Sequence, residues 1–309
     1  MKRKATPTSA AGRETGVPEV RYGTVVGRDF MVQRLLRRGA MGTVYIAEQL
    51  STSGLRALKI LRREYVADDT LFKRFERESQ MAARIPSEHV TQIIASGVDE
   101  KLKVPWIAME LLEGQNLADY VAERGPIEPS EVCEIFEQIC HALSAAHSIG
   151  IVHRDLKPAN VFVSEARRVG AKKMVKVLDF GVARIVAESL TMLGSPLGTP
   201  TWMAPEQTRG DHATQTTDVW ALGLLAFFML TGRSFWRASQ SVGDDPGVMR
   251  EIRDEPVPIA SIRALELGVG ELVPRGFDEW FAQCVARSPG DRFFTATATC
   301  AALLRTLRS

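Results

Sequence analysis

Residues 151–163 read IVHRDLKPANVFV, a stretch that places polar side chains between two short apolar flanks. The flanks, 151–152 and 161–163, are rich in β-branched and aromatic residues, which predicts buried, strand-like anchors. The polar residues between them are His153, Arg154, Asp155, Lys157 and Asn160. A polar loop held at both ends resembles a functional site, and an ordinary solvated turn is an equal alternative on this stretch alone.

Asp179 stands at the end of the next strand-like stretch, 174–178. Together with 161–163, this stretch predicts a β-hairpin, and a hairpin returns its two ends to nearly the same place. We therefore expect Asp179 to lie near Asn160 and Asp155. Two carboxylates and an amide oxygen on one rim suit Mg²⁺, which prefers oxygen ligands and is usually shared with substrate phosphates. The alternative is an Asx turn at the end of a strand.

Gly39 and Gly42 lie between two strand signals in the stretch 36–44. Glycines let backbone N–H groups approach phosphate oxygens closely, although ordinary hairpins also carry them. On the next strand, Lys59 is flanked by apolar residues, where an ammonium is costly without an anionic partner. A phosphate and Glu78 of the following helix are the available partners. The alternative is a lysine that extends its ammonium into water.

The composition is that of an ordinary globular protein, with 309 residues, 45% hydrophobic and 25% charged. A net charge of +2 is too balanced to argue for a nucleic-acid partner. The longest apolar run, 219–230, is shorter than the roughly 20 residues of a membrane span, so it predicts a buried core helix. The cysteines show neither a CxxC pair nor metal-like spacing, which predicts reduced, buried thiols in a cytoplasmic protein. They are Cys133, Cys140, Cys284 and Cys300.

The order of strand and helix signals divides the chain into two parts. Residues 1–20 are basic and lack an apolar core, which predicts a flexible tail rather than a secretory signal. Strand signals follow at 30–36, 43–48, 56–61, 90–97 and 104–111. One helical pattern lies among them, at 69–83. Helical patterns dominate the rest, at 129–149, from 218 onward and at 295–307. We therefore expect a β-rich lobe at 21–109, a hinge at 110–114 and a helical lobe at 115–309, with a ligand site between the lobes.

These motifs, in this order, make the chain similar to the eukaryotic-type (Hanks-type) protein kinases, and closest in character to bacterial serine/threonine kinases. The resemblance covers residues 28 to 300, and independent short matches rarely fall in one order. It implies an α+β, bilobal protein kinase-like fold with a small β-rich lobe and a larger helical lobe. The residues that carry it are the glycine loop, Ala57-Leu58-Lys59, Glu78, His153-Arg154-Asp155-Leu156-Lys157-Pro158-Ala159-Asn160, Asp179-Phe180-Gly181, Ala204-Pro205-Glu206, Asp218-Val219-Trp220 and Arg292.

The resemblance implies transfer of the ATP γ-phosphate to serine or threonine hydroxyls of proteins, including the chain itself. ATP and Mg²⁺, or Mn²⁺ in its place, would be the cofactors. Asp155 would orient the substrate hydroxyl and accept its proton, and Lys157 would steady the transferred phosphate. Asn160 and Asp179 would hold the metal ion, which neutralises charge on the phosphates.

The same resemblance places the nucleotide between the lobes. Lys59 would bind the α- and β-phosphates and be held by Glu78, while the adenine would lie against Ala57. The adenine would form hydrogen bonds with the backbone at 110–112, with Met109 in the gatekeeper position, where it could also be simple strand core. The nucleotide-binding residues implied are Leu36, Gly39, Ala40, Met41, Gly42, Val44, Ala57, Lys59, Met109, Glu110 and Leu112.

Further residues match a branch of the family and a structural contact. Lys157 and Thr199 resemble the serine/threonine-specific branch, in which the region of Thr199 shapes the peptide site. Glu206 and Arg292 match a buried ion pair that supports the helical lobe, and loss of one partner of such a pair is expected to be destabilising.

The loop 181–206 resembles an activation loop, and Arg154 precedes Asp155 as in kinases that are switched by phosphorylation of this loop. A phosphate on one of its hydroxyls would pair with Arg154 and order the loop. The alternative is a polar loop whose hydroxyls are incidental. The candidate hydroxyls are those of Thr191, which we favour, Ser189 and Ser195.

The glycine loop departs from the family pattern G-x-G-x-x-G-x-V at one position. Arg37 stands where the first glycine is expected, whereas Gly39, Gly42 and Val44 match. The change leaves the ATP affinity of the loop open, and the long side chain points either to solvent or toward phosphate. Two rival interpretations are a pseudokinase scaffold and a kinase that acts on small molecules.

The helical part departs from the family pattern in one segment and in where the chain ends. Residues 237–276 are atypical and predict a variable surface segment. The chain ends soon after Arg292, whereas bacterial relatives often continue into a membrane helix and a sensor. We therefore expect a stand-alone kinase or the kinase part of a longer protein, without a membrane segment in this chain and with ATP and protein substrates as partners.

Overall fold

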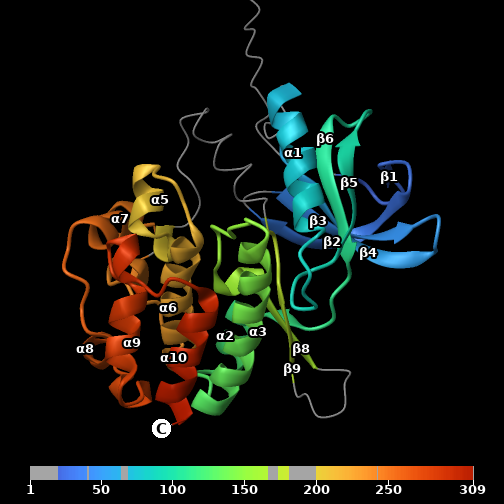
Figure 1. Cartoon of the computed structure of the whole chain (residues 1–309). Coiled ribbons are helices and arrows are strands. Elements are labelled where there is room, and N and C mark those ends of the chain that lie inside the picture. The colour runs from blue at the N-terminus through green and yellow to red at the C-terminus, as the bar shows by residue number, and fades with distance from the viewer. Residues whose placement is uncertain are drawn as a thin grey trace, which may run out of the picture.

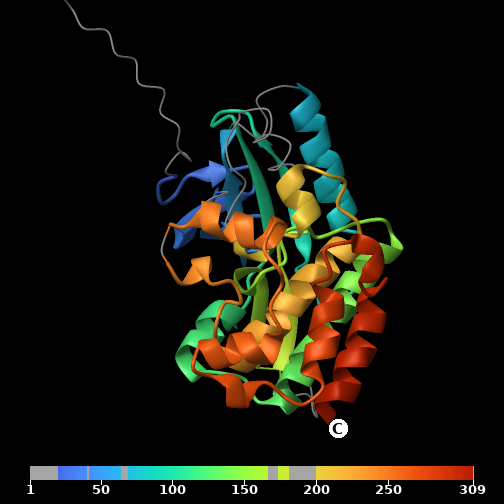
Figure 2. The ribbon, with the colours of Figure 1, turned by 90° about the vertical axis from the view of Figure 1, so that its left-hand side faces the viewer.

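The computed structural model describes residues 20–39, 42–63, 69–165, 173–180, 200–241 and 243–308. Within these ranges a β-rich lobe is followed along the chain by a larger helical lobe (Figures 1 and 2). The predicted α+β, bilobal fold is therefore confirmed. The predicted tail, apart from its last residue, lies outside the described residues, and so do the hydroxyls of Ser189, Thr191, Ser195 and Thr199.

One antiparallel sheet of six strands makes up the β-rich lobe, in the order β1-β2-β3-β4-β6-β5. The strands are β1 (Val25–Val26), β2 (Phe30–Gly39), β3 (Gly42–Gln49), β4 (Gly54–Leu61), β5 (Ile93–Asp99) and β6 (Val104–Glu110). Side chains alternate along a strand, so the sheet has two faces. One face forms an apolar core that includes Tyr45, Leu58 and Trp106. The other carries Lys59, whose ammonium reaches Asp179 of the helical lobe, and we call it the interlobe face.

Helix α1 (Asp69–Ala82) stands beside the sheet (Figure 1), as the apolar spacing of the sequence predicts. Phe75 and Ala82 are buried, because apolar residues at helical spacing share one side of the helix. Glu78 is also buried, at 7% exposure, and so lies on the inner side of the helix despite its charge.

A small sheet of three strands, β7 (Gln115–Asn116), β8 (Val161–Glu165) and β9 (Lys173–Val177), belongs to the helical lobe. Strands β8 and β9 form the predicted hairpin, with Val161 directly opposite Val177. Asn160 directly precedes Val161 and Asp179 follows Val177 by two residues, so both lie at the same end of the hairpin. The sequence argument that brings them together is confirmed.

Residues 89–91 attach the β-rich lobe to this hairpin, and we call them the backbone clip. The Thr91 N–H donates to the Val177 carbonyl at 3.1 Å, and the Val177 N–H donates to the His89 carbonyl at 2.8 Å. The strand predicted at 90–97 therefore begins only at β5, because its first residues pair with β9 instead.

Helices fill the remainder of the helical lobe (Figure 1). They are α2 (Leu117–Arg124), α3 (Pro129–Ser148), α5 (Pro205–Arg209), α6 (Gln215–Thr231), α7 (Asp245–Arg253), α8 (Ala260–Glu266), α9 (Phe277–Cys284) and α10 (Ala296–Arg308). Helix α6 is buried on almost every side, which confirms the core helix predicted at 219–230. In the part of the chain that the structure describes, no helix combines the length and the hydropathy that crossing a membrane requires.

All four cysteines are free and buried, as the sequence predicts. They lie where α3, α9 and α10 meet, with Cys133 and Cys140 on α3, Cys284 on α9 and Cys300 on α10. Burial raises the pKa of the Cys140 and Cys284 thiols well above its usual value, so both stay protonated. Within the described residues, no cluster of three or more histidine, cysteine or acidic side chains is arranged to hold a metal ion.

Candidate active site

The loop between α3 and β8 is held by one buried carboxylate, that of Asp218 on α6. The backbone N–H of His153 donates to Asp218 Oδ2 at 2.9 Å, and that of Arg154 donates to Oδ1 at 2.9 Å. His147 Nε2, at the end of α3, donates to Oδ2 at 2.8 Å. Burial alone would raise the pKa of Asp218, but hydrogen bonding and charge attraction from His147 outweigh it, so the pKa lies below its usual value.

The backbone of this loop is sharply turned. Arg154 has φ 68°, a left-handed conformation that residues other than glycine rarely adopt. The two hydrogen bonds to Asp218 hold this turn, since they fix the N–H groups on both sides of the His153 carbonyl. Strained backbone held by its surroundings is frequent at functional sites.

His153 connects the loop to the end of the hairpin. Its side chain is completely buried, and Nε2 donates to the Leu178 carbonyl at 2.8 Å. The ring also packs edge-on against Phe180, with 4.6 Å between the ring centres. The imidazole therefore fixes both neighbours of Asp179 relative to the loop.

Asp155 presents a partly exposed carboxylate beside a cation and an amide. Lys157 Nζ donates to its two oxygens at 2.8 and 2.9 Å, and Asn160 Nδ2 donates to Oδ2 at 3.0 Å. About a fifth to a quarter of each side chain of the Asp155–Lys157 pair is exposed, at 23% and 24%. Asp155 is thus held in position and still open to a substrate.

Asn160 and Asp179 provide two oxygens on the same rim. The Leu178 N–H donates to the Asn160 carbonyl at 2.8 Å, and this bond ties the two segments together. The Asn160 amide nitrogen faces Asp155, and no described residue donates to its Oδ1. Asp179 has φ 63°, again a left-handed backbone. A free amide oxygen beside a carboxylate is a donor set that suits Mg²⁺.

Lys59 reaches this rim from the interlobe face of the sheet, with its Nζ 2.7 Å from Asp179 Oδ2. Burial alone would raise the pKa of Asp179, but the charge and hydrogen bond of Lys59 outweigh it, so the pKa lies below its usual value. Lys59 thus meets a carboxylate of the helical lobe, and its expected contact with Glu78 stays a prediction.

The residues expected around the adenine line up across the sheet. Ala57 lies directly opposite Met109 and Val44 directly opposite Lys59, so all four belong to the interlobe face. Met109 borders a small cavity of about 20 Å³ that also touches Asp179. Among the described residues, none accepts a hydrogen bond from the Leu112 N–H. This amide and the apolar side chains fit the edge and the faces of a purine.

The glycine loop is a tight connection in which Gly39 pairs with Gly42, and its tip residues Ala40 and Met41 lie outside the described residues. A Cβ at Gly42 would lie 2.2 Å from the Ile60 carbonyl oxygen, so only glycine fits there. At Gly39 a Cβ would meet nothing closer than 3.6 Å. Leu36, also expected at the nucleotide, is 47% exposed on β2.

Glu206 and Arg292 form a buried, two-pronged ion pair deeper in the helical lobe. Arg292 Nη1 and Nη2 donate to the two carboxylate oxygens of Glu206 at 2.7 and 2.8 Å. Thr217 Oγ1 donates to the same carboxylate at 2.8 Å, and the guanidinium lies over the Trp220 ring. Burial would raise the pKa of Glu206, but the hydrogen bonds and charge of Arg292 outweigh it and lower the pKa.

The sequence did not predict the positioning roles of three residues. These are His147, Gln207 and Asp218. Gln207 Nε2 donates to the Arg154 carbonyl at 2.7 Å, and its Oε1 accepts from the Ala204 N–H at 3.0 Å. The role of Asp218 could have been predicted, because an acid at the start of a long apolar run will be buried and needs hydrogen-bond partners. The roles of His147 and Gln207 could not, since their contacts join segments far apart in the sequence.

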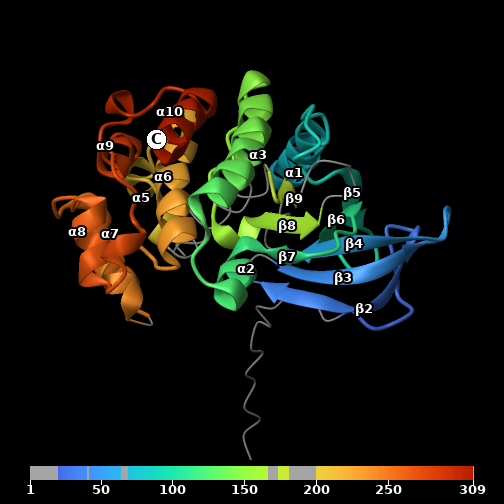
Figure 3. The ribbon, with the colours of Figure 1, turned by 90° about the horizontal axis from the view of Figure 1, so that it is seen from below.

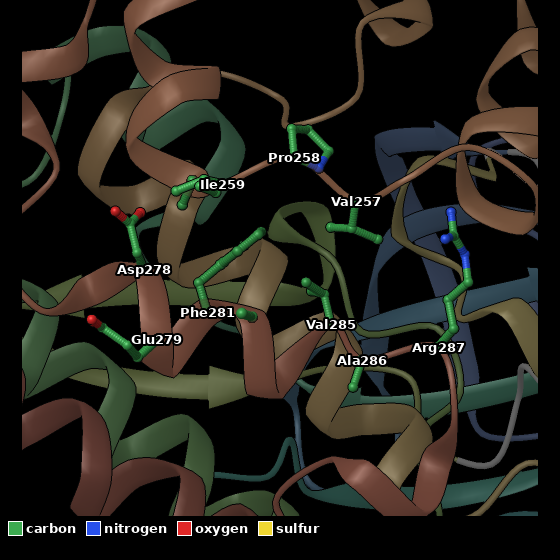
Figure 4. Close-up of a pocket in the computed structure, with 11 residues that line it drawn as sticks. Val257, Pro258, Ile259, Asp278, Glu279, Phe281, Val285, Ala286 and Arg287 are labelled. Atoms are coloured by element: carbon green, nitrogen blue, oxygen red, sulfur yellow. The ribbon is translucent and has the colours of Figure 1, made fainter.

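A larger hollow of about 610 Å³ lies elsewhere in the helical lobe, between α8 and α9 (Figure 4). Its lining is mostly apolar, with Ile259, Phe281 and Val285 in its wall and Asp278 and Glu279 at one end. It contains none of the residues discussed above. Size alone therefore does not identify the site, and the converging polar groups do.

Comparison with known proteins agrees with this geometry. Residues 30–301 match the protein kinase domain family. The chain is 32% identical over 277 residues to the serine/threonine-protein kinase PknB of Mycobacterium leprae, which covers 88% of this chain and 42% of PknB. It is 32% identical over 286 residues to the serine/threonine-protein kinase PknL of Mycobacterium tuberculosis, which covers 92% of this chain and 67% of PknL.

The kinase domain of M. tuberculosis PknI superposes with a TM-score of 0.72 at 26% identity, covering 94% of this chain and 100% of that domain. The chain spans less than half the length of PknB, 42%, so the similarity concerns the kinase domain of that relative. The family matches residues 30–301 of the chain, and the motif residues gather at one rim. The chain therefore belongs to the protein kinase family, in the Hanks-type bacterial serine/threonine branch.

Proposed function

We propose that this protein transfers the γ-phosphate of ATP to serine or threonine hydroxyls of proteins, its own chain included. The observation that carries the proposal is the convergence of three separate segments on one rim. Lys59 Nζ lies 2.7 Å from Asp179, and the Asn160 carbonyl accepts the N–H of Leu178 at 2.8 Å. Phosphoryl transfer depends on positioning and charge neutralisation, which this arrangement of charges favours.

Asp155 is the proposed base. Its carboxylate is fixed by Lys157 and Asn160 and is partly exposed, so it can orient a substrate hydroxyl and accept its proton. Lys157, whose Nζ lies within 2.9 Å of both Asp155 oxygens, would steady the phosphate as it is transferred. The chemistry of the side chains supports both roles, since a carboxylate accepts a proton and an ammonium attracts the phosphate oxygens.

The nucleotide would be held from the sheet and from the hairpin. Asn160 and Asp179 would hold Mg²⁺ or Mn²⁺, which when bound neutralises charge on the phosphates. Lys59 would bind the α- and β-phosphates. Glu78, buried on α1, is the second carboxylate proposed for Lys59. The remaining contacts to ATP are proposed for Leu36, Gly39, Ala40, Met41, Gly42, Val44, Ala57, Met109, Glu110 and Leu112.

The phosphate acceptors in the chain itself are proposed in the activation loop, at Thr191, Ser189 or Ser195. Thr199 is proposed at the peptide site. Glu206 and Arg292 would act only through the stability of the helical lobe.

The replacement Asp155→Asn tests the proposed function. It keeps the size of the side chain but removes the base, so we expect phosphate transfer to fall by roughly 10²–10⁴-fold while ATP binding is retained. Transfer is measured with labelled ATP and Mg²⁺, followed by mapping of the phosphorylated peptides of the chain. Asp254→Asn, which changes an exposed acid at the end of α7, is the matched control and should transfer phosphate like the wild type.

Other outcomes would identify the rival interpretations. Wild-type protein that binds ATP and transfers nothing, in the presence of a bacterial lysate, would support the pseudokinase scaffold. Label that accumulates only in small molecules would support a small-molecule kinase. Transfer by Asp155→Asn at the wild-type rate would refute the assignment of the base.

A further inference from the structure

Arg37 lies in one row with Lys59 across three strands. In β2 it is directly opposite Val44 of β3, and Val44 is directly opposite Lys59 of β4. These strands run side by side (Figure 3). Residues directly opposite each other on antiparallel strands project from the same face of the sheet. Arg37 therefore projects from the interlobe face, as Lys59 does.

The position of Arg37 on this face depends on an irregularity in β2. Leu35 pairs with Tyr45 and Arg37 pairs with Val44, so Leu36 is an extra residue between two consecutive pairs. A shift of one residue exchanges the two faces of a strand. Without the extra residue, Arg37 would project on the side of Tyr45, which is the apolar core.

The neighbouring arginine gives an internal comparison. Arg38 pairs with Thr43, and Thr43 pairs with Ile60 of the apolar core. Arg37 and Arg38 are therefore adjacent, both exposed and both cationic, but project from opposite faces of the same strand. Only the first of them faces the side on which Asp179 and the Lys59 ammonium meet.

The guanidinium of Arg37 is available for a ligand. The side chain is exposed, and it makes neither a hydrogen bond nor an ion pair with any residue in the described ranges. Its backbone is not left-handed, so an arginine fits here without the strain that would require glycine. Guanidinium groups bind phosphate oxygens with two parallel N–H donors, which makes them well suited to polyphosphates.

We propose that Arg37 is a nucleotide-binding residue whose guanidinium contacts the triphosphate of ATP from the interlobe face. It stands two strands from Lys59, at about 10 Å between their backbones, and the length of its side chain closes part of that gap. The sheet thus supplies a second cation, after Lys59, at the position where the family pattern has a glycine. This inference rests on the proposed function, because it concerns the same nucleotide.

Binding of ATP and adenosine to Arg37→Met tests the inference. Methionine keeps an unbranched chain but removes the charge, so we expect ATP with Mg²⁺ to bind about tenfold more weakly and adenosine to bind unchanged. Arg37→Lys keeps the charge without the planar donor pair and should fall between the two. Because the group is exposed, the difference should shrink when salt is raised from 0.05 to about 0.5 M. Titration calorimetry measures all of these affinities.

Arg38→Met is the matched control and should bind both ligands like the wild type. Equal ATP affinity of Arg37→Met and wild type would overturn the inference, as would an equal loss of ATP and adenosine affinity, which indicates a change in loop shape. A higher KM for an acidic peptide with unchanged ATP affinity would also overturn it, because the guanidinium would then contact the protein substrate. Wild-type protein that binds neither ATP nor adenosine would remove the proposed function together with this inference.

Discussion

At the scale of single residues, Asp218 determines the geometry of the loop that carries Asp155. Its two oxygens accept three hydrogen bonds, two from successive backbone N–H groups and one from His147. A carboxylate can do this because both of its oxygens are acceptors, whereas an amide has only one acceptor oxygen. The charge is therefore needed for the shape of the loop, although Asp218 contacts no substrate.

The replacement Asp218→Asn should both destabilise the protein and slow phosphate transfer. One amide NH₂ would face a backbone N–H donor, and the loss of a satisfied buried acceptor costs about 1–3 kcal/mol in the free energy of unfolding. Urea unfolding and the kcat for labelled ATP measure the two effects. Asp278→Asn is the control, because Asp278 also accepts two hydrogen bonds, from Ser261, but far from the loop. An unchanged kcat for Asp218→Asn would contradict the positioning role.

Sequence could predict the chemistry of individual residues better than their contacts. Asp155, Asn160 and Asp179 are recognisable because acids and amides next to apolar strands are unusual and because a hairpin must join its own ends. The sequence left two possible anionic partners for Lys59, a phosphate and Glu78, whereas the structure pairs Lys59 with Asp179. Such a choice depends on distances of a few ångströms between segments far apart in the chain, which spacing along the sequence does not contain.

At the scale of elements, the Glu206–Arg292 pair fastens three segments of the helical lobe. Glu206 lies on α5, and Arg292 follows α9 and also donates to the Thr216 carbonyl at the start of α6 at 2.9 Å. Its Nε donates to the Ala286 carbonyl at 2.7 Å. The guanidinium therefore links α5, the start of α6 and the segment that follows α9.

The replacement Arg292→Met should lower the free energy of unfolding by about 3–5 kcal/mol, because it leaves the Glu206 carboxylate buried without its cation. Urea unfolding followed by circular dichroism measures the loss. The double variant Arg292→Met with Glu206→Leu should recover part of it, since no charge then remains buried. The control is Arg237→Met, which breaks an exposed pair with Glu266 and should change stability little. A single variant as stable as the control would contradict this account.

Elements with a strong pattern were predicted closely, and weakly patterned ones were not. The strands β2, β3 and β4 and the helices α1, α3 and α10 begin and end within a few residues of the expected ranges. Helix α2 was missed because it has only eight residues and is started by a local cap, in which the Asn116 side chain accepts the Asp119 N–H. The extra residue at Leu36 was missed because nothing in the sequence of β2 marks a register shift.

At the scale of the whole molecule, stability should depend on acid in a predictable direction. The pKa values of Glu206 and Asp218 are lower in the folded protein than usual. The unfolded chain, whose carboxyl groups have pKa values of roughly 4, therefore takes up protons first as the pH falls. The stability that these groups contribute is complete above about pH 5 and is lost as the pH falls toward their folded pKa values.

The urea midpoint should therefore change little with these groups between pH 7 and pH 5.5 and fall steadily below about pH 5. The variant Glu206→Gln should start from a lower midpoint at pH 7 and then lose less on acidification, because one of the titrating groups is gone. Unfolding curves at several pH values measure both slopes. A midpoint that rises on acidification below pH 5 would contradict the direction of these pKa shifts.

The division into two lobes could be predicted from the sequence, but the way in which they are joined could not. The chain passes from one lobe to the other after β6, and the backbone clip at residues 89–91 makes a second attachment to β9. Lys176 Nζ, 2.6 Å from Glu110, adds an ion pair between the two attachments. Two neighbouring attachments define an axis about which one lobe can rotate relative to the other.

Asp179 stands two residues beyond Val177 and so lies close to this axis, whereas Gly39 and Gly42 belong to β2 and β3, which β4 separates from β6. We expect the Asp179 carboxylate to move little in such a rotation and Gly39 and Gly42 to move farther. Entry and departure of a nucleotide would then depend on how far these two glycines move relative to Asp179.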